Sequence, residues 1–120
     1  MAVTGIGGFF FRSADPKALA AWYLTHLGVG APEGQYLWDQ AAGPTVFSPF
    51  KADTDYFAAD KAFMLNLRVE GLDDMLAMLR ASGIEVITKP EWDAYPEMGR
   101  FARIHDPEGN AIELWEPGKA

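Results

Sequence analysis

The stretch from Phe101 to Trp115 constrains the fold of this chain more than any other part of the sequence. Two runs of alternating side chains flank the segment 106–110, which reads Asp-Pro-Glu-Gly-Asn. Pro107 presets φ for a turn and Gly109 tolerates a positive φ, so the chain can reverse its direction there. The pattern predicts a β-hairpin with three cross-strand pairs: Phe101 with Trp115, Arg103 with Glu113, and His105 with Ala111.

The predicted hairpin has two different faces, because successive side chains of a strand point to opposite sides of the sheet. The apolar face needs a layer of helices against it and consists of Ala102, Ile104, Ile112 and Leu114. The other face mixes charged, polar and aromatic groups: Phe101, Arg103, His105, Ala111, Glu113 and Trp115. Ligand pockets combine apolar walls with a few placed polar groups, so this second face is typical of a cavity lining.

Two amphipathic helices are predicted before the hairpin. Asp15 can cap the first helix, Pro16 suits its first position, and Gly28 ends it. The second helix has apolar residues at three- and four-residue spacing from Leu72 onward and ends at Gly83. We read the recurrence of a strand, a helix and further strands as a weak internal duplication, with a period of about 55 residues.

Short alternating or apolar runs predict five further strands: Ile6–Arg12, Gln35–Asp39, Thr45–Ser48, Phe63–Val69 and Glu85–Thr88. The strand Phe63–Val69 also has two faces. One is apolar, and the other carries Met64, Asn66 and Arg68. Residues 51–61 have no clear period and are expected to form a loop or a short irregular connector, with one short strand as an alternative. The loop Pro90–Met98 carries Trp92 and Tyr95, which we expect either at the rim of a cleft or against a partner subunit.

Length and charge limit the classes of function. A chain of 120 residues supports one domain with an ordinary core. The net charge of −7 disfavours nucleic acid as a partner, and the absence of cysteine removes disulfides, thiolate metal sites and cysteine nucleophiles. No run approaches a membrane span, and no signal peptide is recognisable, so we expect a cytoplasmic protein with no membrane partner.

The closing run, Asp106-Pro107-Glu108-Gly109-Asn110 followed by Ile112-Glu113-Leu114, resembles the final signature of the glyoxalase, bleomycin resistance protein and dioxygenase superfamily, also called the vicinal oxygen chelate superfamily. The resemblance implies an α+β fold in which two βαβββ modules form a curled mixed sheet around a cleft, with helices outside. The implied modules span about 5–50 and about 63–117, with a linker at about 51–62. The resemblance also implies a homodimer, with the cleft completed across the subunits.

The superfamily's metal-dependent members include lactoylglutathione lyase and extradiol dioxygenases, and their ligands are His, Glu or Gln. The resemblance places the four ligand positions on Gly8, on Met64, on Glu113 and near Phe47. Only Glu113 is a competent ligand for a hard divalent ion, and a catalytic metal normally takes about three protein ligands. We therefore expect no metal cofactor, while a shifted site that includes His105 stays an alternative. Arg103 is expected to pair with Glu113 across the strands.

The expected ligand is a small anionic or zwitterionic molecule with an apolar or aromatic part, because arginine forks suit carboxylates and phosphates. Arg12 is the first choice for the anionic group, since the resemblance implies a carboxylate-binding arginine at this strand position. The other expected ligand-binding residues are Phe10, Met64, Asn66, Arg68, Phe101, Arg103 and Trp115.

Two enzymatic alternatives stay open beside simple binding. The first is a metal-dependent glyoxalase-like lyase, isomerase or dioxygenase that uses Glu113. The second is a metal-free enzyme with His105 or Glu113 as the general base. The sequence leaves open whether the chain is an enzyme.

Overall fold

The computed structural model describes residues 1–118. Its elements in chain order are α1 (Pro16–Leu27), β1 (Leu65–Arg68), α2 (Leu72–Ala81), the 3-10 helix η1 (Pro90–Asp93), β2 (Gly99–His105) and β3 (Ala111–Pro117). Three strands form one mixed sheet in the order β1-β3-β2, with β1 parallel and β2 antiparallel to the central β3. The predicted α+β class is confirmed.

The hairpin has the predicted register. Phe101 pairs with Trp115, Arg103 with Glu113, and His105 with Ala111. The predicted apolar face is the core, and its four side chains on β2 and β3 are completely buried: Ala102, Ile104, Ile112 and Leu114.

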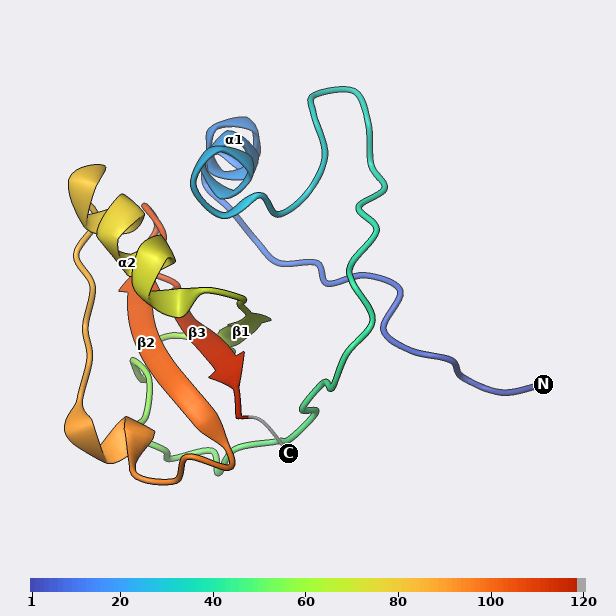
Figure 1. The fold of residues 1–120 in the computed structure, drawn as a ribbon. Coiled ribbons are helices and arrows are strands. Elements are labelled where there is room, and N and C mark those ends of the chain that lie inside the picture. The colour runs from blue at the N-terminus through green and yellow to red at the C-terminus, as the bar shows by residue number, and fades with distance from the viewer. Residues whose placement is uncertain (119–120) are drawn as a thin grey trace.

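Both helices cover this apolar face of the sheet, as Figure 1 shows. Leu19 and Tyr23 of α1, together with Leu72, Leu76 and Leu79 of α2, pack with the sheet in one hydrophobic cluster. The predicted helix ends are confirmed as well. Asp15 caps α1 through its side chain, and Gly28 closes that helix with a φ of 66°. None of the helices in the described part of the chain is long and apolar enough to cross a bilayer.

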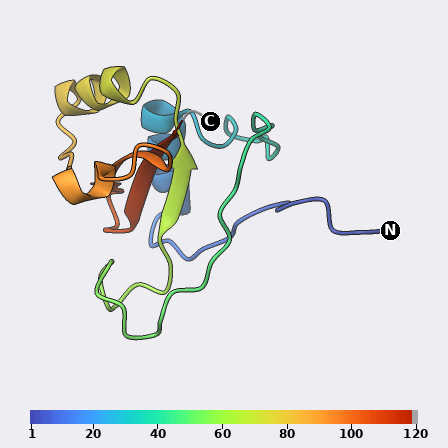
Figure 2. The same ribbon diagram turned by 60° about the horizontal axis from the view of Figure 1, so that its bottom comes forward.

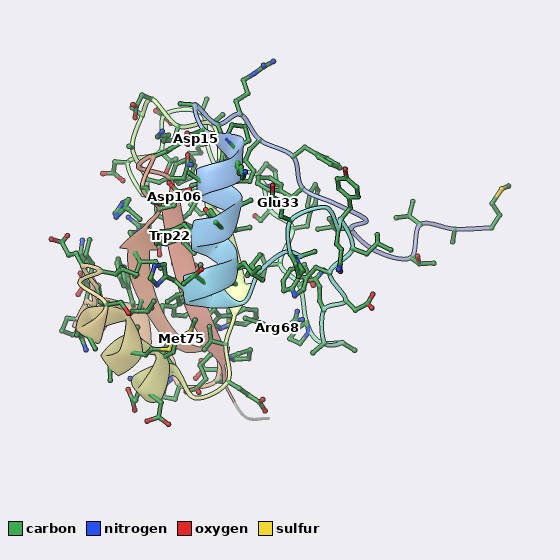
Figure 3. The ribbon with its side chains drawn as sticks, turned by 90° about the horizontal axis from the view of Figure 1, so that it is seen from above. Asp15, Trp22, Glu33, Arg68, Met75 and Asp106 are labelled. Carbon is green, nitrogen blue, oxygen red and sulfur yellow. The ribbon has the colours of Figure 1, made fainter. Side chains whose placement is uncertain are left out.

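The hairpin turn fastens the first half of the chain to the second. Asp106 is buried and accepts hydrogen bonds from the Tyr23 hydroxyl (2.7 Å) and from the Asn110 side chain (2.8 Å). Glu108 accepts from the Ser13 hydroxyl at 2.6 Å and from the Ala14 backbone N–H at 2.9 Å, directly before α1. In Figure 3, Asp15 at the start of α1 lies at the same end of the molecule as Asp106.

The predicted strands of the first half are wrong for the described chain. Within residues 1–118 no strand precedes β1, so the segments Ile6–Arg12, Gln35–Asp39 and Thr45–Ser48 form neither helix nor strand. A strand exists only through backbone hydrogen bonds to a neighbour, and these segments follow the outside of the molecule without pairing with the sheet, as Figures 1 and 2 show.

The predicted strand Glu85–Thr88 is reduced to a single bridge, in which Ile87 exchanges two backbone hydrogen bonds of 2.8 Å with Arg103. The predicted strand Phe63–Val69 is shorter than expected and spans Leu65–Arg68. Its faces are as predicted: Leu65 and Leu67 pack against the core cluster.

Candidate functional site

The sheet face opposite the helices carries a connected polar cluster centred on Glu113. This side chain of β3 is only 7% exposed. Its Oε1 accepts a hydrogen bond of 2.8 Å from the Asn66 amide of β1, and its Oε2 accepts one of 2.5 Å from the Tyr56 hydroxyl. Both carboxylate oxygens therefore have a neutral donor.

Arg103 lies opposite Glu113 in the β2–β3 register, yet the two side chains form no ion pair in the described chain. The Arg103 guanidinium instead lies over two aromatic rings, 4.7 Å from the centre of Tyr56 and 5.4 Å from that of Trp92. Such contacts stabilise a cation through the ring quadrupole. The predicted Arg103–Glu113 ion pair is thus wrong, because neutral donors satisfy the carboxylate and two rings hold the guanidinium.

Two nitrogen atoms of Arg103, Nη2 and Nε, lack a strong hydrogen-bond acceptor in the described chain. Nη2 donates to the sulfur of Met64 at 3.5 Å, and a thioether is a weak acceptor. Nε is buried and has no hydrogen-bond partner within residues 1–118. A buried donor without an acceptor destabilises the fold, and such exceptions are few in folded proteins. Arg103 is therefore the side chain of this cluster that is best able to accept a ligand.

Tyr56 was not among the residues predicted for the site. It comes from the segment 51–61, which contains no helix or strand, and its hydroxyl donates to Glu113. Burial and the hydrogen bond to Glu113 raise the pKa of Tyr56 to about 12, against an opposing effect of Arg103. The phenol thus keeps its proton at neutral pH and acts as a donor. The signal that could have found it is the aromatic content of an otherwise acidic connector, where Phe50, Tyr56 and Phe57 occur together.

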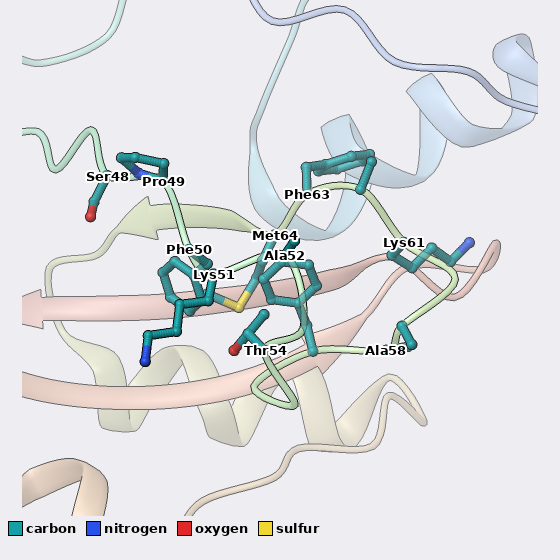
Figure 4. Close-up of a pocket in the computed structure, with 13 residues that line it drawn as sticks. Ser48, Pro49, Phe50, Lys51, Ala52, Thr54, Ala58, Lys61, Phe63 and Met64 are labelled. Carbon is teal, nitrogen blue, oxygen red and sulfur yellow. The ribbon is translucent and has the colours of Figure 1, made fainter.

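A cavity of about 540 Å³ adjoins the cluster and is shown in Figure 4. Its wall combines aromatic and thioether groups with two ammonium groups: Phe50, Phe57, Phe63, Met64, Lys51 and Lys61. In Figure 4 the two ammonium groups lie at opposite ends of the cavity. One of them, that of Lys61, also donates to the Glu108 carbonyl at 3.1 Å.

Two side chains join the cavity to the Glu113 cluster. Met64 lines the cavity and contacts Arg103 through its sulfur. Phe50 lines it too, and the ring of Phe50 lies 5.6 Å from that of Tyr56. The cavity and the cluster are therefore neighbouring parts of one site, and segment 51–61 contributes to both.

Two further predicted ligand-binding residues lie on the same sheet face. Phe101 and Trp115 are stacked, with ring centres 6.2 Å apart and planes inclined by 7°. The Trp115 indole donates to the Met98 carbonyl at 2.8 Å, which fixes its orientation. The stacked pair lies one residue pair along the same sheet face from Arg103 and Glu113.

The structure gives the remaining predicted site residues other surroundings. Phe10 is 94% exposed and Arg12 is exposed as well, on the unpaired segment before α1. Arg68, which is labelled in Figure 3, donates to the backbone carbonyls of Ala41 and Pro44 and so attaches segment 41–45 to β1. His105 is exposed at the end of β2.

The residues present do not fit a metal centre. Gly8 has no side chain, Met64 contacts Arg103 through its sulfur, and both oxygens of Glu113 already accept hydrogen bonds. No three histidine, aspartate or glutamate side chains converge within residues 1–118 in a way that could hold a metal ion.

The comparison with solved structures finds a similarity to an antibiotic-binding protein. The chain superposes on TnmS3, an antibiotic-binding protein from Streptomyces sp. CB03234, with a TM-score of 0.59 and 26% sequence identity. The match covers 98% of this chain and 99% of that one. No protein-family model matches the chain, and no curated protein sequence matches it. The α+β architecture is consistent with a bleomycin-resistance-like fold, and the similarity supports small-molecule binding of that type.

Proposed function

We propose that this chain binds a small anionic or zwitterionic molecule with an apolar or aromatic part, and that it does so without a metal. The observation that carries the proposal is the similarity to an antibiotic-binding protein over 98% of the chain. The composition of the site supports it, because aromatic walls and a few placed cations are what such a ligand needs. Arg103 would hold the anionic group, and the cavity beside Met64 would take the apolar body.

The proposal predicts that aromatic carboxylates stabilise the purified protein and that neutral isosteres do so less. A ligand raises the apparent stability by mass action when it binds only the folded state. Thermal unfolding with a panel of aromatic carboxylates and their amides or alcohols tests this. The absence of any stabilising member, followed by a flat calorimetric titration with the same panel, would contradict the proposal.

The metal-free part of the proposal has its own measurement. Elemental analysis of protein purified without chelators or affinity metals should find far less than one divalent ion per subunit. Addition of zinc, nickel, manganese or ferrous ions should leave the unfolding temperature unchanged. Stoichiometric metal that is lost in Glu113→Ala would instead favour the metal-dependent lyase or dioxygenase.

We further propose that the chain works as a homodimer. The first half presents large apolar side chains on segments whose backbone is unpaired, among them Phe10, Leu37 and Phe47, which are 94%, 89% and 89% exposed. Apolar patches of this kind mark interaction surfaces, and unpaired extended segments favour pairing with another chain. A second copy would cover these side chains and add its own to the site.

A further inference from the structure

We propose that Tyr56 and Asn66 are positioning residues. Their hydrogen bonds to the Glu113 carboxylate keep it from pairing with Arg103, so that the charge of Arg103 stays available for an anionic group of the ligand. This inference rests on the proposed function and names what makes the site selective for anions. It starts from a conflict in the sheet. Arg103 and Glu113 are direct cross-strand partners, and opposite charges in such positions normally attract one another.

The hydrogen bonds of Glu113 resolve that conflict. Tyr56 and Asn66 donate to different oxygens of the carboxylate, at 2.5 and 2.8 Å. Each donor is neutral, so the carboxylate is satisfied as an acceptor while no cation is used to satisfy it. A donor that leaves would expose a buried carboxylate oxygen without a partner, and the nearest charge of opposite sign across the strands is that of Arg103.

The surroundings of Arg103 describe the group it would accept. The rings of Tyr56 and Trp92 lie over the guanidinium, so its plane is restricted and its edge carries the donors. On that edge, Nε has no partner in the described chain and Nη2 reaches only the Met64 sulfur. A planar carboxylate can take two parallel N–H donors from such an edge. The ligand class is therefore a carboxylate attached to an apolar body.

The overall charge of the chain favours a site in which the charge of Arg103 is kept available. With a net charge of −7, the protein repels anions at long range. A cation that stays uncompensated at short range offsets this repulsion, and Arg103 is such a cation on the polar face of the sheet. Tyr56 has two parts in this: its hydroxyl engages Glu113, and its ring contacts the Arg103 guanidinium.

The test separates the hydroxyl of Tyr56 from its ring. Tyr56→Phe removes the donor to Glu113 and keeps the aromatic contact with Arg103. The probe is 1-naphthoate in isothermal titration calorimetry, with 1-naphthalenemethanol as its neutral counterpart. We expect naphthoate to bind Tyr56→Phe about tenfold more weakly than wild type, while the affinity for the neutral probe changes less than about twofold. The matched control is Tyr36→Phe, at a tyrosine that is 92% exposed and lies outside the cluster, and this variant should bind both probes as wild type does.

A double variant distinguishes positioning from loss of packing. In Tyr56→Phe/Glu113→Gln no carboxylate is left to pair with Arg103, so the affinity for naphthoate should return to within about twofold of wild type. A double variant that binds naphthoate as weakly as Tyr56→Phe would overturn the inference. So would a Tyr56→Phe variant that binds naphthoate as tightly as wild type.

A measurement without ligand keeps the inference testable if the wild type binds neither probe, an outcome that counts against the proposed function alone. The NMR signal of the Arg103 Nε–H group reports its surroundings directly. We expect Tyr56→Phe to shift this signal, and the added Glu113→Gln change to reverse most of the shift. If Tyr56→Phe leaves the signal where it is in wild type, Arg103 does not turn to Glu113 and the inference is wrong.

Discussion

The hydroxyl of Tyr23, in the middle of α1, donates a hydrogen bond of 2.7 Å to Asp106 in the hairpin turn, 83 residues further along the chain. Both side chains are buried, and burial together with this bond raises the pKa of the phenol above its usual value. The turn 106–110, which resembles a family signature in sequence, therefore attaches α1 to the sheet in this structure.

Tyr23→Phe is expected to destabilise the protein by about 1–3 kcal/mol, because it leaves a buried carboxylate oxygen short of a donor. The free energy of unfolding in urea measures this. Tyr36→Phe is the matched control, since Tyr36 is exposed and the same atom is removed. Equal stability of the two variants would show that the bond to Asp106 contributes nothing.

The hydrogen bonds to Glu108 predict that the protein becomes less stable as the pH falls. Its hydrogen bonds from Ser13, Ala14 and Asp15 hold the pKa of the Glu108 carboxyl below its usual value. Its contribution is therefore complete above the pKa of the unfolded state and is lost as the pH falls through the folded one. The unfolding temperature of Glu108→Gln should lie below that of wild type at neutral pH and approach it on acidification. Glu97→Gln, at an exposed loop position, should keep a constant difference from wild type.

The raised pKa of Tyr56 predicts that the protein becomes less stable as the pH rises into the alkaline range. Its pKa is raised from 10.0 to about 12, with burial as the largest cause. The stabilisation that this phenol provides is complete below its unfolded pKa and is lost as the pH rises through the folded one. A spectrophotometric titration should show one phenol that ionises near the raised value in wild type and is missing in Tyr56→Phe. If the two titration curves differ instead near 10.0, Tyr56 is not engaged with Glu113.

The proposed dimer predicts that a charge on the exposed apolar surface of the first half lowers the oligomeric state. Phe47→Glu should elute and scatter light as a monomer, because burying an unpaired carboxylate in an interface is costly. Met78→Glu is the control, since Met78 is a partly exposed apolar residue on α2 outside that surface. A wild-type protein that is monomeric at every concentration would refute the dimer.

The second half of the chain and both helices were predictable because their signals are local. The turn at 106–110 and the alternation on both sides of it specify the hairpin register, down to the pair of Arg103 with Glu113. Asp15 and Gly28 mark the ends of α1 by their own conformational preferences. Each of these features depends on residues that are neighbours in sequence or that are linked by one short turn.

The strands of the first half and the centre of the site depended on contacts that no local pattern specifies. An alternating run forms a strand only if a partner strand is present, and the segment 35–48 has none in the described chain. The partner of Glu113 was mispredicted for a related reason: the register brought Arg103 opposite, but Tyr56 arrives from a connector without periodicity.

By itself, the sequence determined the class of the fold, the two helices, the hairpin and which residues share each face of the sheet, because periodicity and turn chemistry act over a few residues. Only the tertiary structure decided which groups on the polar face pair with one another. The carboxylate of Glu113 accepts from the Tyr56 hydroxyl and forms no ion pair with Arg103 in the described chain, because segment 51–61 places that hydroxyl within hydrogen-bond distance. The position of this segment depends on the tertiary structure, and no local pattern in the sequence specifies it.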